Sequence, residues 1–228
     1  MSEDASAPAP ATQPVVLFDF DGVLFRGDAF TALMRAHFGR QWWRFLLALP
    51  LAVCLSPLAI LRRTRSRVVR AVVHVALLGL DEARYGAIAT RFAHGLALDS
   101  RHFLAAGLRA LRRHQLDARV IVVTGCEKTL ARALLDALGL PEVELVASRL
   151  VAGRFGLRVG VHNVGKEKLR QLAHAGVTPP WQVAYGDSLA DVAMLAAAES
   201  PVLVNAGRKL RIAITRRIGR EPAVELWH

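Results

Sequence analysis

Short apolar runs that end beside an acid or a hydroxyl constrain the fold of this chain more than any other feature. The run 15–20 (VVLFDF) contains Asp19 near its end and is followed by Asp21, the run 120–123 is followed by Thr124 and Gly125, and the run 183–185 is followed by Gly186 and Asp187. Uninterrupted apolar runs of this length are typical of parallel strands buried on both faces. Functional side chains of open α/β sheets gather where such strands end.

Helical patterns separate these runs. They cover 127–138, 166–175 and 189–198, a further apolar run lies at 202–204, and the glycines of 149–161 indicate a hairpin. Alternating strands and helices predict a parallel sheet with helices on both faces. We therefore predict an α/β fold with a Rossmann-like, three-layer core.

A long insert interrupts this core after the first strand. Roughly 95 residues separate the first predicted strand from the second, far more than one crossover needs. Asp28 and Asp81 are placed to cap helices over 29–38 and 82–94. We predict an all-helical cap at 28–114, a catalytic core formed by 15–27 and 115–228, and a disordered leader at 1–14. The leader has no signal-peptide pattern, so we expect a cytoplasmic protein.

The first strand-end motif is Asp19-Phe20-Asp21-Gly22. Two carboxylates two residues apart can face one ligand, one as a nucleophile and the other as a proton shuttle. Gly22 permits a tight turn whose amide hydrogens can face phosphate oxygens. An ordinary surface turn explains this common pattern equally well when it is taken alone.

The second and third motifs carry donors. The Thr124 hydroxyl and the Gly125 amide can bind one phosphate, although Thr124 also suits the N-cap of the next helix. Lys166 and Lys168 open a predicted helix, where a lysine can offset phosphoryl charge. A solvent-exposed helix face is the ordinary alternative for either lysine.

The fourth motif is Gly186-Asp187-Ser188-Leu189-Ala190-Asp191. Asp187 at a strand end can contribute to the oxygen shell of Mg²⁺. Asp191 lies four residues further, about one helical turn away, and can orient groups around the metal. Magnesium is therefore the expected cofactor.

The four motifs, in this order over about 15–205, resemble the haloacid dehalogenase superfamily. The resemblance implies Asp19 as nucleophile, Asp21 as acid/base, and Thr124, Gly125 and Lys168 as phosphate ligands. It also implies a magnesium site formed by Asp19, the main-chain carbonyl of Asp21, and Asp187, with Asp191 in support. An insert after the first motif and the stretch GKEKLRQL, which selects Lys168, resemble the branch that contains phosphoserine phosphatases. The expected activity is hydrolysis of a phosphomonoester.

The cap contains an unusual apolar segment. Residues 45–61 carry no charge, Trp42-Trp43-Arg44 precede them, and RRTRSR follows at 62–67. The segment is slightly too short to cross a bilayer as a helix, and Pro50 and Pro57 interrupt it. We therefore expect 42–67 to contact an anionic membrane surface from the cytoplasmic side, as a peripheral or monotopic segment. An apolar cap core with a basic rim, or a dimer contact, is the alternative.

Charge and composition favour an anionic partner. Between residues 29 and 80 there are eight arginines and no acidic residue. We expect no nucleic-acid partner, because the basic residues flank an apolar segment and form no recognisable reading motif. Cys54 and Cys126 have no metal-ligand or disulfide spacing.

The whole chain is similar to the bacterial phosphatidylglycerophosphatase C family in VVLFDFDGVLFRGDAF, in the leucine-rich LALPL segment, and in GKEKLRQL with GDSLAD. This similarity implies a lipid phosphate substrate, phosphatidylglycerol phosphate. Two alternatives stay open: a phosphatase of a soluble metabolite such as phosphoserine or a sugar phosphate, and a non-enzymatic phospho-receiver-like module.

Overall fold

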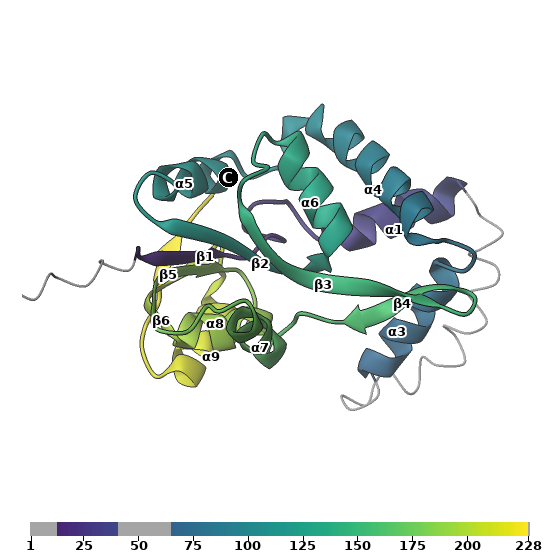
Figure 1. Ribbon diagram of the computed structural model, residues 1–228. Helices are drawn as coiled ribbons and strands as arrows, with labels where there is room; N and C mark the ends of the chain where they lie inside the picture. Colours follow the sequence, from purple (N-terminus) through teal and green to yellow (C-terminus); the bar gives the residue numbers. More distant parts are fainter. Residues whose placement is uncertain (1–12, 41–64, 228) are drawn as a thin grey trace, which may run out of the picture.

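The computed structural model describes residues 13–40 and 65–227 and shows a seven-stranded sheet in the order β4-β3-β2-β1-β5-β6-β7 (Figure 1). All neighbouring strands are parallel except β3 and β4, which form an antiparallel hairpin. The α/β prediction and the hairpin are confirmed. The strands are β1 (Val15–Phe18), β2 (Arg119–Glu127), β3 (Glu144–Gly153), β4 (Gly156–Val161), β5 (Trp181–Gly186), β6 (Ala198–Val204) and β7 (Ala223–Glu225).

Two of the helices begin at the acids that the sequence indicated as caps. The Asp28 carboxylate accepts a hydrogen bond from the Thr31 amide, and Asp81 accepts one from Arg84, which satisfies amides that the helix itself leaves unpaired. The described helices are α1 (Ala29–Arg40), α3 (Arg65–Ala76), α4 (Glu82–Ala97), α5 (Ala105–His114), α6 (Lys128–Ala137), α7 (Lys166–His174), α8 (Val192–Ala196) and α9 (Arg208–Ile218).

The sheet is covered on both faces because its strands are apolar on both faces (Figure 1). Val16 and Phe18 of β1 pack into a cluster with residues of α5 and α6, whereas Leu17 between them packs into a second cluster with residues of α7, α8 and α9. Successive side chains of a strand point to opposite faces, so one short run serves both layers.

Figure 1 shows α1, α3 and α4 of the predicted insert at one end of the molecule and α5 at the opposite end. Helix α4 contacts α6, α3 contacts β4, and α5 contacts β2 as the chain returns to the sheet. The exact boundaries of the cap stay a prediction. Most of the expected membrane-contact segment 42–67 lies outside the described residues, and no described helix is long and apolar enough to span a bilayer.

One predicted helix is wrong in its extent. The pattern over 189–198 indicated a continuous helix, but the structure has a 3₁₀ turn, Leu189–Asp191, followed by the short helix α8. The cause is a capping box in which the side chains of Ser188 and Asp191 each bind the other's main-chain amide. The chain is therefore held in a tight turn before the helix starts.

Gly107 of α5 allows the helix to approach the loop after β1. A Cβ atom there would lie 2.4 Å from the Val23 carbonyl oxygen and 3.0 Å from Cζ3 of Trp227. We expect Gly107→Ala to lower the free energy of unfolding by roughly 1–3 kcal/mol, because buried sites tolerate added volume poorly. Chemical denaturation measures the change.

Gly95 of α4 is the matched control, since a Cβ atom there would meet nothing within 4 Å. Gly95→Ala should raise the free energy of unfolding by about 0.5–1 kcal/mol through helix propensity. If both variants gained stability, the close approach of α5 would be wrong.

Candidate active site

The position of β1 in the middle of the sheet brings the sequence motifs together. Phe18 lies in register with Val122 of β2 on one side and with Tyr185 of β5 on the other. The residues that follow these strands therefore share one edge of the sheet, where ligands of parallel sheets bind. Asp19 and Asp187 both border a cavity at this edge.

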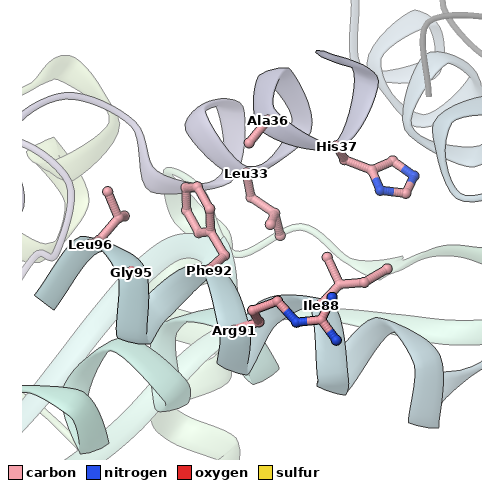
Figure 2. A pocket seen from close by; sticks show the side chains of 8 residues that line it. All are labelled: Leu33, Ala36, His37, Ile88, Arg91, Phe92, Gly95 and Leu96. Atoms are coloured by element: carbon pink, nitrogen blue, oxygen red, sulfur yellow. The ribbon is translucent and has the colours of Figure 1, made fainter. Parts of the chain in front are cut away.

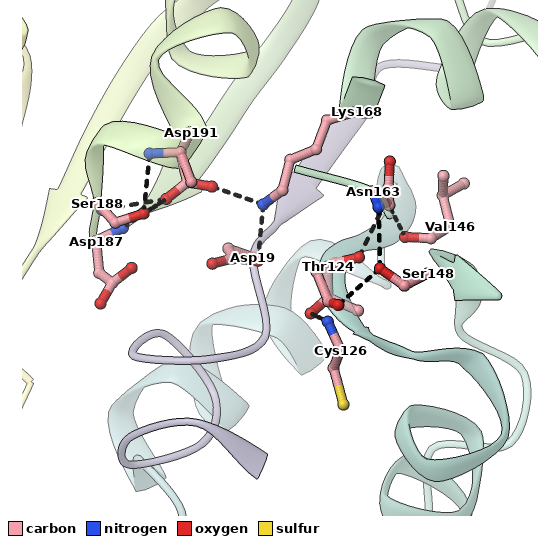
Figure 3. Close-up of polar contacts among 12 residues, drawn as sticks. Asp19, Thr124, Cys126, Val146, Ser148, Asn163, Lys168, Asp187, Ser188 and Asp191 are labelled. Carbon is pink, nitrogen blue, oxygen red and sulfur yellow. Dashed lines mark hydrogen bonds and ion pairs between the residues drawn. The ribbon is translucent and has the colours of Figure 1, made fainter. Parts of the chain in front are cut away.

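A buried ion-pair cluster lies at this edge. The Lys168 ammonium donates to Oδ1 of Asp19 at 2.8 Å and to Oδ1 of Asp191 at 2.6 Å (Figure 3). The three side chains are 2%, 9% and 0% exposed. Burial alone would lower the pKa of Lys168, but Asp19 and Asp191 raise it above its ordinary value. Lys168 is thus a fixed positive charge beside the predicted nucleophile.

Asp191 holds the fourth motif in place. Its Oδ2 accepts hydrogen bonds from the Ser188 amide at 3.1 Å, the Ser188 hydroxyl at 2.9 Å and the Asp187 amide at 3.3 Å (Figure 3). Gly186 leaves room for this side chain, because a Cβ atom there would come 2.7 Å from Cβ of Asp191. Both carboxylate oxygens of Asp191 are therefore engaged, one by the turn and one by Lys168.

Carboxylates outnumber cations in this part of the site. Burial and the nearby Asp191 raise the pKa of Asp19 well above its ordinary value. Burial likewise raises the pKa of Asp21 to about 7 and that of Asp187 to about 6. A raised pKa means that each of these three carboxyl groups is harder to ionise than usual. A further positive charge in the pocket, in addition to Lys168, would stabilise their ionised forms.

The oxygen donors fit a magnesium ion. Carboxylate oxygens of Asp19, Asp187 and Asp191 lie within 4.8 Å of one another. Since both Asp191 oxygens already accept hydrogen bonds, Asp19 and Asp187 are the side chains left to hold a metal. Mg²⁺ favours a few carboxylates supplemented by water and phosphate. A metal contact from the main-chain carbonyl of Asp21 stays a prediction.

Gly22 permits the first and fourth motifs to touch. Its φ is +78°, and a Cβ atom on it would lie 1.9 Å from Oδ2 of Asp187. The neighbouring Asp21 accepts a hydrogen bond on Oδ1 from the Ala29 amide at 2.8 Å, at the first residue of α1. The loop after β1 therefore contacts the second acidic motif on one side and the cap on the other.

In the second motif, Thr124 and Gly125, the threonine hydroxyl is bound within the protein. Thr124 is fully buried, and its hydroxyl oxygen accepts a hydrogen bond from the Cys126 amide at 2.9 Å. Gly125 borders the cavity. The alternative that Thr124 caps the next helix is wrong, because Glu127 caps α6 by accepting from the Leu130 amide at 3.0 Å. Phosphate binding by Thr124 and Gly125 stays a prediction.

A cavity of about 740 Å³ covers the acidic cluster, a volume within the usual range for small-ligand sites. Core and cap both contribute to its wall. The acids Asp19, Asp21 and Asp187 border it together with Lys168. The rest of the wall includes the apolar side chains of Phe30, Met34, Val73, Leu150 and Val159, the basic side chains of Arg35, Arg149 and His162, and the polar or acidic side chains of Ser148, Asp28 and Glu127.

A second hollow, of about 380 Å³, lies between α1 and α4 (Figure 2). Leu33 of α1 faces Ile88 and Phe92 of α4 across it, and the polar side chains at its edge are His37 and Arg91. It contains none of the residues that the sequence motifs predicted, so we place the active site in the larger cavity.

Comparison with known proteins agrees with this geometry. The family model of haloacid dehalogenase-like hydrolases matches residues 16–196. The chain belongs to this family. The matched range extends from β1 through the insert to the end of α8 and includes all four motifs.

Similar solved structures support the fold. A Bordetella pertussis Tohama I protein of unknown function aligns with a TM-score of 0.68 and 18% identity over 93% of this chain and 99% of its own. A Francisella tularensis phosphoserine phosphohydrolase-like protein aligns at 0.63 and 12%, over 93% and 94%. A phospho-aspartyl intermediate analogue of phosphoserine phosphatase aligns at 0.56 and 16%, over 93% of each chain.

The sequence analysis missed Asn163 and Ser148. Both are buried polar residues that bind the main chain around Thr124 and Gly125 (Figure 3). Asn163 lies two residues before the helix-opening glycine, and Ser148 lies within a strand. A single polar residue in either place is common, so the sequence carries no signal for this role.

The contact between Gly22 and Asp187 gives a direct test. Gly22→Ala should lower kcat/KM for an aryl phosphate by about 100-fold, because a displacement of about 1 Å in an active site has that order of effect. Phosphate release measures it. Gly27→Ala is the control: Gly27 also has a positive φ, +90°, but a Cβ atom there meets nothing within 4 Å. Equal losses in both variants would mean that backbone strain, and not the collision, is responsible.

Proposed function

We propose that this protein is a magnesium-dependent phosphomonoester hydrolase that forms an aspartyl-phosphate on Asp19. The observation that carries the proposal is the buried Lys168 ammonium, which pairs with Oδ1 of Asp19 beside Asp187. This arrangement fixes one oxygen of the nucleophile and leaves the other available. Membership of the hydrolase family supports the same reading.

The proposed reaction has two steps. An Asp19 carboxylate oxygen attacks phosphorus, a new O–P bond forms, and the bond from phosphorus to the leaving oxygen breaks while Asp21 gives that oxygen a proton. Asp21 then takes a proton from water as the water oxygen attacks phosphorus, which releases phosphate and restores Asp19. A pKa of about 7 for Asp21 suits both roles. Asp19 and Asp187 would hold magnesium, which would supply positive charge against the phosphoryl oxygens.

We propose a lipid phosphate as the substrate, with phosphatidylglycerol phosphate as the specific candidate. The cavity wall combines apolar side chains with Arg35, Arg149 and His162 at positions away from the acids. Arg35 and Arg149 form no ion pair with a described residue. Phosphatidylglycerol phosphate offers a terminal phosphate for hydrolysis, a second negative charge at its phosphodiester, and apolar chains.

The sequence similarity to the phosphatidylglycerophosphatase C family supports the same substrate. With this substrate we propose a location on the cytoplasmic face of the inner membrane, where such a lipid would expose its headgroup. The uncharged segment 45–61 and the arginines that follow it would provide the contact with anionic lipid.

A soluble phosphomonoester is the second candidate. Asp28 and Glu127 also border the cavity, and acidic side chains there suit a substrate with an ammonium group, such as phosphoserine. A phospho-receiver module fits less well, because a receiver needs neither the large inserted cap nor the second acid at Asp21.

Asp19→Asn tests the catalytic proposal. Phosphate release from an aryl phosphate in Mg²⁺ should fall below 1% of the wild-type rate by order of magnitude, since the amide cannot form the covalent intermediate. Asp117→Asn, at an exposed acid between α5 and β2, should keep full activity. A chelator should stop the wild-type enzyme. An Asp19→Asn variant with a tenth of the wild-type rate would exclude Asp19 as the nucleophile.

The substrate proposal is tested with a panel and one variant. Phosphate release is compared for phosphatidylglycerol phosphate, phosphatidic acid, phosphoserine and an aryl phosphate, and the first should give the highest kcat/KM. Arg35→Gln should lower that value about tenfold, the order of effect of one hydrogen bond to a charged group, and should leave the aryl phosphate nearly unaffected. Arg91→Gln, outside the active-site cavity, is the control. Preference for phosphoserine would favour the soluble substrate.

A further inference from the structure

Two buried side chains outside the predicted motifs hold the peptide groups on either side of Gly125. Asn163 donates both hydrogens of its amide, to the Thr124 carbonyl at 3.0 Å and to the Val146 carbonyl at 2.9 Å. The Ser148 hydroxyl donates to the Gly125 carbonyl at 2.7 Å and accepts from the main-chain N–H of Asn163 at 2.9 Å (Figure 3). Asn163 is 0% exposed and Ser148 is 6% exposed.

These contacts determine where the Gly125 N–H points. A peptide group is planar and trans, so its C=O and N–H point in opposite directions. The Thr124 carbonyl points at Asn163, and the Gly125 N–H in the same peptide group must point away from it. Gly125 borders the active-site cavity, whereas the buried Asn163 does not. The N–H is therefore directed to the cavity side.

The next peptide group is fixed in the same way. The Gly125 carbonyl is bound by Ser148, and the opposing Cys126 N–H donates to the Thr124 hydroxyl at 2.9 Å. Gly125 thus lies between two peptide groups whose orientations are both set by side chains, and its N–H belongs to the first of them.

The sheet itself does not orient this segment. Pairing of β2 with β1 ends at Val122, and pairing with β3 is irregular between Val123 and Glu127. The chain around Gly125 leaves the regular register where it reaches the active site. Side-chain hydrogen bonds replace the missing ladder, as buried carbonyl groups require partners.

We infer that Asn163 and Ser148 are positioning residues that aim the Gly125 N–H at the phosphoryl group transferred to Asp19. Asn163 does not border the cavity; Ser148 borders it, but its hydroxyl is occupied by the Gly125 carbonyl and the Asn163 main-chain N–H. Their effect passes through a main-chain donor that binds a phosphoryl oxygen more strongly as charge develops in the transition state. This inference rests on the proposed phosphatase activity and adds to it two residues that the four motifs do not contain.

A positioning role predicts a specific kinetic effect. Ser148→Ala frees the Gly125 carbonyl and should lower kcat about tenfold, less than the 10²–10³ that loss of a whole donor costs. KM should change less than about twofold, and inhibition by orthovanadate, a mimic of the transition state, should weaken about tenfold with kcat. The Mg²⁺ concentration for half-maximal rate should not change, because the metal ligands are untouched.

Ser148→Thr is the rescue variant, because it keeps the hydroxyl and suits a strand; it should recover most of kcat and of vanadate inhibition. Ile214→Val, in the core of α9, is the control for lost stability and should retain kcat. If Ser148→Ala does not fold, Ser148→Cys, with a weaker donor of similar size, takes its place and should give an intermediate kcat.

The inference is overturned if the folded Ser148→Ala variant keeps at least half the wild-type kcat, if only KM changes, or if threonine fails to rescue while folding normally. A failure of the proposed phosphatase activity would be recognised by different results. The wild-type protein would release no phosphate, or activity would survive Asp19→Asn, before the Ser148 variants are compared.

Discussion

The buried ion pairs of Lys168 hold together segments that are far apart in the sequence. The ammonium at the start of α7 joins Asp19, 149 residues earlier, to Asp191, 23 residues later. A buried charge costs several kcal/mol unless it is paired and hydrogen-bonded, so each partner depends on the others. Replacement of Lys168 would leave two buried carboxylates without compensation. The lysine therefore maintains the site as well as neutralising charge in it.

The sequence was sufficient to predict the α/β fold, the hairpin and the helix caps, since these depend on local patterns. It also indicated Asp19, Lys168, Asp187 and Asp191 as neighbours, which the structure confirms, because parallel strands place their carboxyl ends at one edge. The sequence was insufficient to predict geometry that depends on contacts between residues far apart in the chain. Asn163, which follows β4, binds one carbonyl of β2 and one of β3, and nothing in its own neighbourhood in the sequence indicates those partners.

The cavity wall illustrates the same limit. Phe30 comes from α1, Val73 from α3, and Leu150 and Val159 from the hairpin strands, yet all four border one cavity. Each fits the ordinary apolar pattern of its own element, so periodicity does not distinguish it from core. The sequence analysis instead centred on 42–67, because an uncharged run is visible locally. In the described part of the chain, the cavity wall arises from the packing of helices of the insert against the core.

The hydrogen bond from the Ala29 amide to Asp21 connects helix α1 of the insert to the acidic cluster of the core. The amide belongs to the first residue of α1, and the positive end of a helix favours an ionised carboxylate. Burial acts in the opposite direction and is the larger influence, which leaves the pKa of Asp21 at about 7. Phe30 and Arg35 of the same helix border the cavity. A shift of α1 would therefore change the cavity wall and the environment of the Asp21 carboxyl together, so the position of this helix and the ionisation of Asp21 depend on each other.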